Sequence, residues 1–433
     1  MNPSLEATAV PGVMQPARLR TLQTLGMFCG FAAGAWLGGA EAPIKLVNPN
    51  ISPVTVSLVM VCGVFLARWS VPALIRGTAH LRTDIGQAPH LIVWAILAGC
   101  MWAVANTLTI YAIRNVGLSI AFPLWNTNSL LGIFWGFLLF KELHAAGWKR
   151  WLGVIGGALS MFAGATMLAV ASSHEAAPGK AALGIAAALG AGILWGTMYI
   201  PYRKAYLTGM NPLSFITFFT VGELATMLVL AITYSGAGPL WHELNGARPV
   251  LFWLMLGGFV WVIGDLFQQY ATKYVGISRG IPLSNTNQLW GLLWGILVFH
   301  ELRGSTHATY AQVAGGSVLM ALGALAIALS SATEREHSSW RGAAEREGER
   351  YGVEGEYVRA GMEGRAHGTS TTGRTIADWI LILGTTGLFM VLAVAAKLPR
   401  MEIGVGWAIG LTVAMVTLLA TCGVALWRTT RFR

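Results

Sequence analysis

Residues 22–171 recur as residues 181–330, at a constant offset of 159 positions. The clearest copy joins Pro123–Leu143, which reads PLWNTNSLLGIFWGFLLFKEL, to Pro282–Leu302, which reads PLSNTNQLWGLLWGILVFHEL. Further pairs at the same offset are Trp36 and Trp195, Lys45 and Lys204, Pro53 and Pro212, Trp102 and Trp261, Asn106 and Asp265, and Gly157 and Gly316. No gap interrupts the correspondence, so the two blocks are expected to fold into the same succession of elements.

Each block contains five apolar runs long enough to cross a bilayer. The ten runs cover residues 22–40, 52–74, 91–112, 118–140, 149–171, 182–202, 212–234, 250–272, 277–299 and 308–330. With 55% apolar and 11% charged residues, the sequence predicts an all-α polytopic membrane protein. Because five is odd, the second block enters the membrane in the opposite sense. We therefore expect a ten-helix transporter bundle of five-plus-five inverted repeats about an axis in the membrane plane, which favours alternating access.

The remaining segments are separated by sharp changes of composition. Residues 1–21 are polar and precede the first span as a cytoplasmic N-terminus. Residues 331–375 contain seven Arg and eight Glu without a long apolar run, which predicts a solvated linker, disordered or loosely helical. Two more apolar runs, 376–396 and 404–427, predict a transmembrane hairpin, so residues 376–433 form a final unit with a basic tail.

The 29 lysines and arginines indicate topology rather than a nucleic-acid surface. They lie mainly in short turns between apolar runs, without the interleaved aromatic residues of a nucleic-acid stripe. A cytoplasmic N-terminus places most of them on the cytoplasmic side, which predicts both termini inside the cell and a location in the cytoplasmic (inner) membrane. The four cysteines show no paired spacing. Lipid is therefore an expected partner, whereas no metal, cofactor or nucleic acid is expected; the oligomeric state is open.

The duplicated motif places uncharged polar side chains inside two spans, where unpaired amides are costly. On a helix, Asn287 and Trp294 share a face, and Asn128 and Trp135 repeat that pattern. Sugar C–H faces pack on indole rings while hydroxyls need amide partners, so this arrangement suits a polyhydroxylated ligand. The candidate substrate-binding residues here are Asn126, Asn128, Trp135, Asn285, Asn287, Gln288 and Trp294. The alternative is helix packing, with Gly-xxx-Gly seams and bridging Asn side chains.

Two carboxylates, Asp265 and Glu223, lie well inside spans of the second block without a basic residue one helical turn away. A buried carboxylate can couple transport to protons. Asp265 is favoured, because its repeat mate Asn106 is neutral and the two half-sites could then differ in protonation. For Glu223 the alternative is a protonated acid bonded to a nearby carbonyl. Asn106 and Gln269 join the candidate substrate-binding residues, and the coupling ion is left open between protons and sodium.

Two other acids end the duplicated motifs. Glu142 follows Lys141, and Glu301 precedes Arg303 by two residues. Because the basic neighbours are so close and the spans end there, both acids are expected to form interfacial ion pairs rather than to line a site.

The run from Trp261 to Leu289 also resembles a known transporter family. It contains Gly-x-Ser-Arg-x-x-Pro-Leu-Ser-x-x-x-Gln-Leu over residues 276–289, and in this it resembles the glucose/ribose uptake permeases, a branch of the drug/metabolite transporter superfamily. The first-block segment from Gly99 to Ser119 is similar to the related rhamnose–proton symporters. These resemblances imply five-plus-five inverted repeats and the uptake of a sugar, with protons as the coupling ion in the symporters.

The function expected from the sequence is secondary active import of a monosaccharide or similar polar metabolite by alternating access. One alternative is an exporter of amino acids or other metabolites, and another is a passive channel or membrane sensor, which the additional hairpin would suit. An enzyme is not expected, because the spans carry no Ser/His/Asp set, no His-Glu-x-x-His motif and no cluster of carboxylates for a metal. No nucleotide-binding loop is recognisable either.

Overall fold

A computed structural model describes residues 16–47, 51–116, 121, 124–171, 181–365, 373–397 and 402–433. All regular secondary structure in these ranges is helical, and nine of the helices are long and apolar enough to cross a membrane. The all-α polytopic membrane fold is thereby confirmed. Of the ten expected spans, the first, fourth and ninth are not among these nine helices, and the fourth and ninth are interrupted at the duplicated motif.

The helices of the first block follow the predicted order. They are α1 (Pro16–Gly39), α2 (Glu41–Lys45), α3 (Pro53–Arg76), α4 (Ala79–Gln87), α5 (His90–Val116), α7 (Asn128–Phe140) and α8 (Trp148–Ala171). The helices of the second block are α9 (Ala181–Leu207), α10 (Pro212–Ser235), α11 (Ala237–Gly246), η2 (Arg248–Val250), α12 (Leu251–Val275), α13 (Ile277–Ser284), α14 (Asn287–Leu293), the π-helical turn η3 (Trp294–Val298) and α15 (His307–Leu329). The last helices are α16 (Glu334–Arg350), α17 (Gly355–Met362), α18 (Ile376–Ala395) and α19 (Val405–Thr430).

Equivalent residues begin and end the second span of each repeat. Ser52 caps α3 by accepting a hydrogen bond from a backbone N–H, and Asn211 caps α10 in the same way, each followed by a proline at the first helical position. Gly77 and Gly236 end these helices with φ of 76° and 79°. The offset of 159 relates both pairs, so the duplication has preserved the helix limits.

The contact between α8 and α15 shows how the repeats are related. A Cβ atom on Gly157 would meet the carbonyl oxygen of Gly323, and one on Gly164 would meet that of Gly316. Gly157 and Gly316 are repeat mates, and so are Gly164 and Gly323, so each contact joins one residue to the mate of the other contact's residue. Two contacts that exchange partners in this way are related by a two-fold axis. The early part of α8 faces the late part of α15, so these repeat mates are antiparallel, as expected for inverted repeats.

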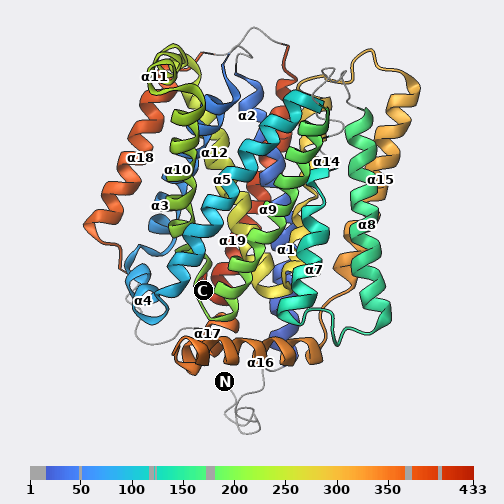
Figure 1. Cartoon of the computed structure of the whole chain (residues 1–433), viewed down its shortest axis with the longest axis vertical. Helices are drawn as coiled ribbons and strands as arrows, with labels where there is room; N and C mark the ends of the chain where they lie inside the picture. Colours follow the sequence, from blue (N-terminus) through green and yellow to red (C-terminus); the bar gives the residue numbers. More distant parts are fainter. Residues whose placement is uncertain are drawn as a thin grey trace.

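The described part of residues 331–375, which were expected to be solvated and disordered or loosely helical, is helical but includes buried side chains. Two helices, α16 and α17, lie across one end of the bundle (Figure 1). Trp340 is only 1% exposed and stacks under Arg203, whose guanidinium carbon lies 4.5 Å from the ring centroid. The α16 sequence is polar on average but places Trp340 and Ala344 on one face, and that apolar face packs on the end of α9. Composition alone did not reveal this amphipathic pattern.

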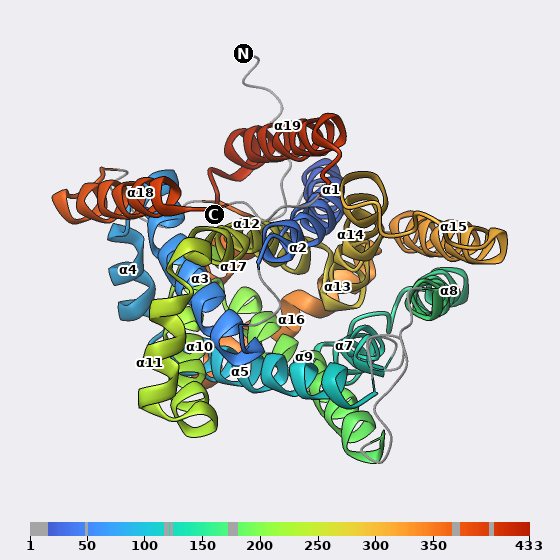
Figure 2. The ribbon, with the colours of Figure 1, turned by 90° about the horizontal axis from the view of Figure 1, so that it is seen from above.

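The two C-terminal helices lie at the periphery of the bundle, on different neighbours (Figure 2). Helix α18 packs on α3, whereas α19 packs on α1, where Trp36 donates a hydrogen bond to the carbonyl oxygen of Met415. The start of α1 and the end of α19 meet at the α16 end, since Arg18 donates to the carbonyl oxygens of Glu363 and Thr429. The two described ends of the chain therefore lie at the same end of the bundle.

Candidate functional site

The two copies of the duplicated motif interrupt their spans at the same place. In the second copy α13 ends at Ser284, Asn285 and Thr286 form a turn, and α14 begins at Asn287. In the first copy Asn126 and Thr127 form the turn and α7 begins at Asn128. Pro123 lies outside the described residues. Broken helices expose backbone polar groups at membrane depth, which is tolerated where the backbone is covered by protein or lines a cavity.

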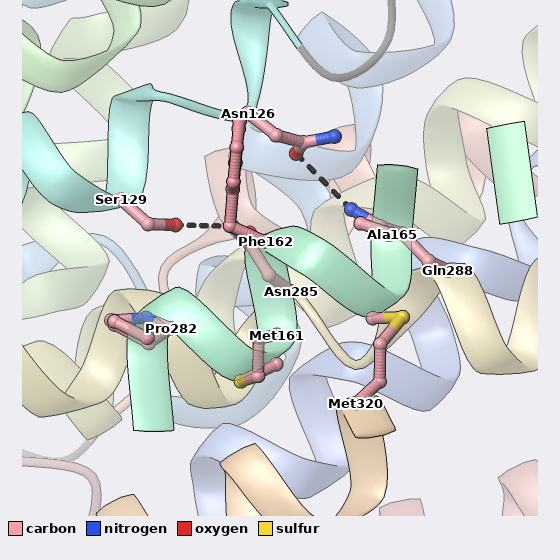
Figure 3. A pocket seen from close by; sticks show the side chains of 10 residues that line it. Asn126, Ser129, Met161, Phe162, Ala165, Pro282, Asn285, Gln288 and Met320 are labelled. Carbon is pink, nitrogen blue, oxygen red and sulfur yellow. Dashed lines mark hydrogen bonds between the residues drawn. The ribbon is translucent and has the colours of Figure 1, made fainter. Parts of the chain in front are cut away.

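Reciprocal hydrogen bonds join the two turns. Gln288 donates from Nε2 to Oδ1 of Asn126 at 3.1 Å, and Asn285 donates from Nδ2 to the hydroxyl of Ser129 (Figure 3). The offset of 159 maps one bond onto the other, so the pair straddles the pseudo-two-fold axis. Both bonds and Pro282 border a cavity of about 10 Å³, which is room for about one water molecule. In this conformation the polar turns are thus almost closed on one another.

Of the remaining motif residues, Asn128 is buried and Asn287, Trp135 and Trp294 are half-buried, and none of them lines that cavity. Asn128 accepts a hydrogen bond from the Ser129 hydroxyl at 3.3 Å, while Oδ1 of Asn287 is buried without a partner among the described residues. Trp135 packs in the cluster around Tyr199, and Trp294 packs in a different cluster near Trp36. The two tryptophans thus lie in different clusters in this conformation, and their assignment to the substrate site stays a prediction. Their indole N–H groups are buried, and neither has a hydrogen-bond partner in the described ranges.

A charge cluster joins three helices in the membrane interior. Arg68 of α3 donates to Glu223 of α10 at 3.0 Å and to Asp265 of α12 at 2.8 Å. All three side chains are at most 1% exposed. Gln269 donates to the second oxygen of Asp265 at 2.9 Å, and Tyr206 donates to the amide oxygen of Gln269. Two carboxylates facing one guanidinium give the cluster a formal charge of −1 when all three groups are ionised.

Aromatic rings surround the guanidinium of Arg68. Its central carbon lies 4.1 Å from the ring centroid of Phe219 and 5.2 Å from that of Trp261. Trp261 in turn meets Trp102, its repeat mate, edge-on at 5.3 Å. These rings exclude water and strengthen the electrostatic interactions of the cluster.

Sequence reasoning found Asp265, Glu223 and Gln269 but missed Arg68, the residue that joins the two carboxylates. The search for basic neighbours was confined to one turn of the same helix, whereas Arg68 reaches both acids from another helix. Its signal was an arginine inside the apolar run 52–74. The repeat mate of Asp265 behaves differently, since Asn106 donates to the Ser57 hydroxyl at 3.2 Å. The charge cluster therefore has no counterpart at the equivalent positions, where Arg68 corresponds to Met227.

Glu142 is not the interfacial residue that its neighbour Lys141 suggested. It is fully buried, forms an ion pair with Arg203 at 2.8 Å, and accepts the backbone N–H groups of Ile277 and Ser278. The start of α13 thus turns its free N–H groups toward a carboxylate, which stabilises the charge. Glu301 does form an ion pair, with Lys45, and these side chains are 47% and 39% exposed.

The chain was compared with known proteins. Residues 185–347, which span most of the second repeat and α16, match the model of a family described as sugar transport protein. A protein of Listeria innocua whose name assigns it to sugar uptake is 23% identical over 240 residues, which cover 54% of this chain and 78% of that protein. The resemblance to sugar permeases is confirmed. A glucose uptake protein of Staphylococcus xylosus is 24% identical over 236 residues, 53% of this chain and 76% of its own.

Another match covers a shorter segment at higher sequence identity. A protein of Streptococcus pyogenes, also named for sugar uptake, is 43% identical over 65 residues, which cover 14% of this chain and 23% of that protein. These relatives are named for uptake rather than for an enzymatic reaction, in agreement with the expectation that the chain is not an enzyme.

Proposed function

We propose that this protein is a secondary active transporter that imports a monosaccharide or similar polar metabolite across the cytoplasmic membrane. The observation that carries the proposal is the pair of reciprocal hydrogen bonds, Asn126 with Gln288 and Asn285 with Ser129, between two interrupted spans. Amides and a hydroxyl that now bond one another across a pseudo-two-fold axis can exchange these bonds for sugar hydroxyls. The similarity to proteins named for sugar uptake supports the same substrate class.

The two ends of the bundle support alternating access, because equivalent groups are in different states there. At the α16 end Glu142 and Arg203 are at most 1% exposed, and Glu142 also holds the start of α13. At the opposite end its repeat mate Glu301 pairs with Lys45 at 47% and 39% exposure. The ion pair at the α16 end is thus buried, whereas the ion pair at the opposite end is exposed. Exchange of these two states between the repeats would move the access route from one side to the other.

The topology proposed from the basic residues places the α16 end and both termini in the cytoplasm. The described conformation then has its cytoplasmic end closed. Glu336 of α16 reinforces that closure, because it accepts from the backbone N–H of Leu143 in the first repeat and from Arg279 in the second.

We assign energy coupling to the cluster of Arg68, Glu223 and Asp265. Its formal charge of −1 is costly in the membrane interior, and binding of one proton would neutralise it. Arg68 belongs to the first repeat and both carboxylates to the second, so any movement between repeats changes the distances that govern proton binding. A sodium ion could neutralise the same excess charge. Accumulation of substrate under an imposed proton gradient alone, compared with accumulation under a sodium gradient alone, would show which ion is coupled.

Reconstituted liposomes test the proposal with labelled pentoses, hexoses, deoxysugars and amino acids. A secondary importer gives saturable exchange of one substrate and its accumulation under an imposed ion gradient. Replacement of Asn126 or Gln288 by Leu should abolish both activities, whereas Thr386→Val on the exposed face of α18 should leave them intact. Non-saturable flux without exchange would identify a channel, and net extrusion of amino acids would identify an exporter.

A further inference from the structure

A second cavity lies at the α16 end and is lined by residues from the ends of α3 and α12 and from α4 and α17. Helices α4 and α17 are labelled in Figure 1. The volume of the cavity is about 70 Å³, which is room for several water molecules. The charged and titratable side chains that line it are Arg76, His80, Asp84, Lys273, Arg365 and Arg433. It is separate from the interrupted spans and from the buried cluster around Arg68, and the proposed transport cycle makes no use of it.

The charges around this cavity are not balanced. Asp84 is its single acid and already accepts a hydrogen bond from the Tyr357 hydroxyl at 2.6 Å. Arg365 has an ion-pair partner in Glu363. His80 is neutral near pH 7, because burial lowers its pKa to about 4. Arg76 and Lys273 therefore share the single carboxylate of Asp84 in this cavity.

Lys273 is the most exceptional of these groups. The residue is 6% exposed, and its ammonium has no hydrogen-bond partner in the part of the chain that the structure describes. It lies 5.9 Å from the ring centroid of Tyr274, a weak cation–π contact. A buried ammonium without hydrogen bonds is costly, so its presence beside a polar cavity indicates a missing acceptor.

We propose that this cavity binds a phosphate group, either that of a soluble phosphorylated metabolite or that of an anionic phospholipid headgroup. A phosphate carries up to two negative charges and several acceptor oxygens. It thus matches the basic lining of the cavity, the fork of the Arg76 guanidinium and the three donors of Lys273. A chloride ion would match the charge but would leave most of the cavity empty.

Binding at this place holds several elements together. The wall of the cavity includes the end of α3 from the first repeat, the end of α12 from the second and α17, which follows the repeats. Gly361 of α17 packs directly on Gly209, so α17 also covers the end of α9. A bound phosphate therefore favours the conformation in which α17 is docked and the α16 end is closed.

Thermal unfolding of the purified full-length protein tests binding, with inorganic phosphate as the probe and sodium chloride of equal ionic strength as the reference. Phosphate should raise Tm in a saturable manner. Lys273→Met should raise Tm without phosphate, because it removes a buried amino group that has no hydrogen-bond partner among the described residues, and should weaken the phosphate effect about tenfold or more. Arg335→Gln, on the exposed side of α16, should behave like the wild type. No saturable rise in the wild type, or an undiminished rise in Lys273→Met, would overturn the proposal.

A second variant and two membrane compositions complete the test. If Lys273→Met does not fold, Arg365→Gln at the rim should weaken the phosphate effect several-fold while the protein remains folded. The titration is then repeated in nanodiscs of phosphatidylcholine with and without phosphatidylglycerol. Loss of the phosphate response in phosphatidylglycerol identifies a lipid headgroup as the occupant, whereas an equal response in both identifies a soluble phosphate. These measurements do not involve transport, so their failure leaves the proposed function standing.

Discussion

Replacement of Asp265 by Asn removes one of the two carboxylates that share Arg68 and leaves an Arg68–Glu223 pair of zero net charge. The new amide can still accept from Arg68, but its NH2 group then faces the NH2 group of Gln269. A flip of Gln269 relieves this conflict only if the Tyr206 hydroxyl becomes an acceptor. We therefore expect the disturbed buried hydrogen bond to cost about 1–3 kcal/mol in the free energy of unfolding, offset in part by removal of the excess negative charge.

Removal of the Arg68 guanidinium should lower the stability of the protein more than removal of the Asp265 carboxylate does. Arg68→Met leaves both carboxylates buried without a counter-charge, and breaking a buried ion pair in this way costs about 3–5 kcal/mol. The order of thermal stability should thus be wild type, then Asp265→Asn, then Arg68→Met. If the three side chains contributed only by packing and not by their charges, the two variants would show similar losses of thermal stability.

Transport by Asp265→Asn separates coupling from substrate binding. The excess negative charge is absent from the variant in every conformation, so proton binding no longer depends on the arrangement of the repeats. Liposomes should retain substrate exchange at equilibrium but lose accumulation under an imposed pH gradient. Accumulation at the wild-type level with the pH gradient alone would refute the assignment, and the same pair of assays on Glu223→Gln would then show whether the other carboxylate is responsible.

Four further outcomes are expected. Asn287→Leu should abolish uptake without reducing membrane insertion, and wild-type uptake would instead favour a packing role. Gly157→Ala should lower Tm, because the new Cβ would lie 2.6 Å from the carbonyl oxygen of Gly323, whereas Gly156→Ala, with open space around it, should not. Trp340→Ala should destabilise the docking of α16 by about 3–5 kcal/mol, seen as faster hydrogen exchange in α16 alone. Burial lowers the pKa of His337 from 6.5 to about 3, so α16 should lose stability as the pH falls between these values, and exchange rates in α16 that do not change with pH would contradict this.

The fold could be predicted from the sequence because it depends on features that repeat along the chain. Apolar runs fix the spans, and repeated caps such as Ser52 and Asn211 fix where equivalent helices begin. The span expected over residues 277–299 is interrupted at Asn285, three residues after Pro282, where Asn and Thr replace apolar residues. Amphipathic α16 was missed because its apolar face is narrow and its mean composition is that of a linker.

The site was harder to predict, since its contacts join distant parts of the chain. Spacing on one helix grouped Asn287 with Trp294, and α14 is regular from Asn287 to Leu293, but this spacing does not indicate which helices face the two residues. The reciprocal bond of Asn126 to Gln288 needs the two-fold arrangement, and the partner of Asp265 is 197 positions away. Periodicity on a single helix contains no information about such pairs.

The position of the charge cluster relative to the repeats explains why a duplicated bundle can be coupled to an ion. A transporter with two equivalent halves can exchange its two end states at little energetic cost, and nothing in that symmetry selects a direction. Arg68 breaks the symmetry, because its equivalent position is Met227 and its partners Glu223 and Asp265 both lie in the other repeat. Movement of α3 against α10 and α12 must lengthen or shorten these ion pairs, so the protonation of one carboxylate changes the relative energy of the two end states. In the proposed function, this asymmetric charge across a symmetric interface would let an ion gradient bias the two end states, provided that substrate binding is linked to the same change.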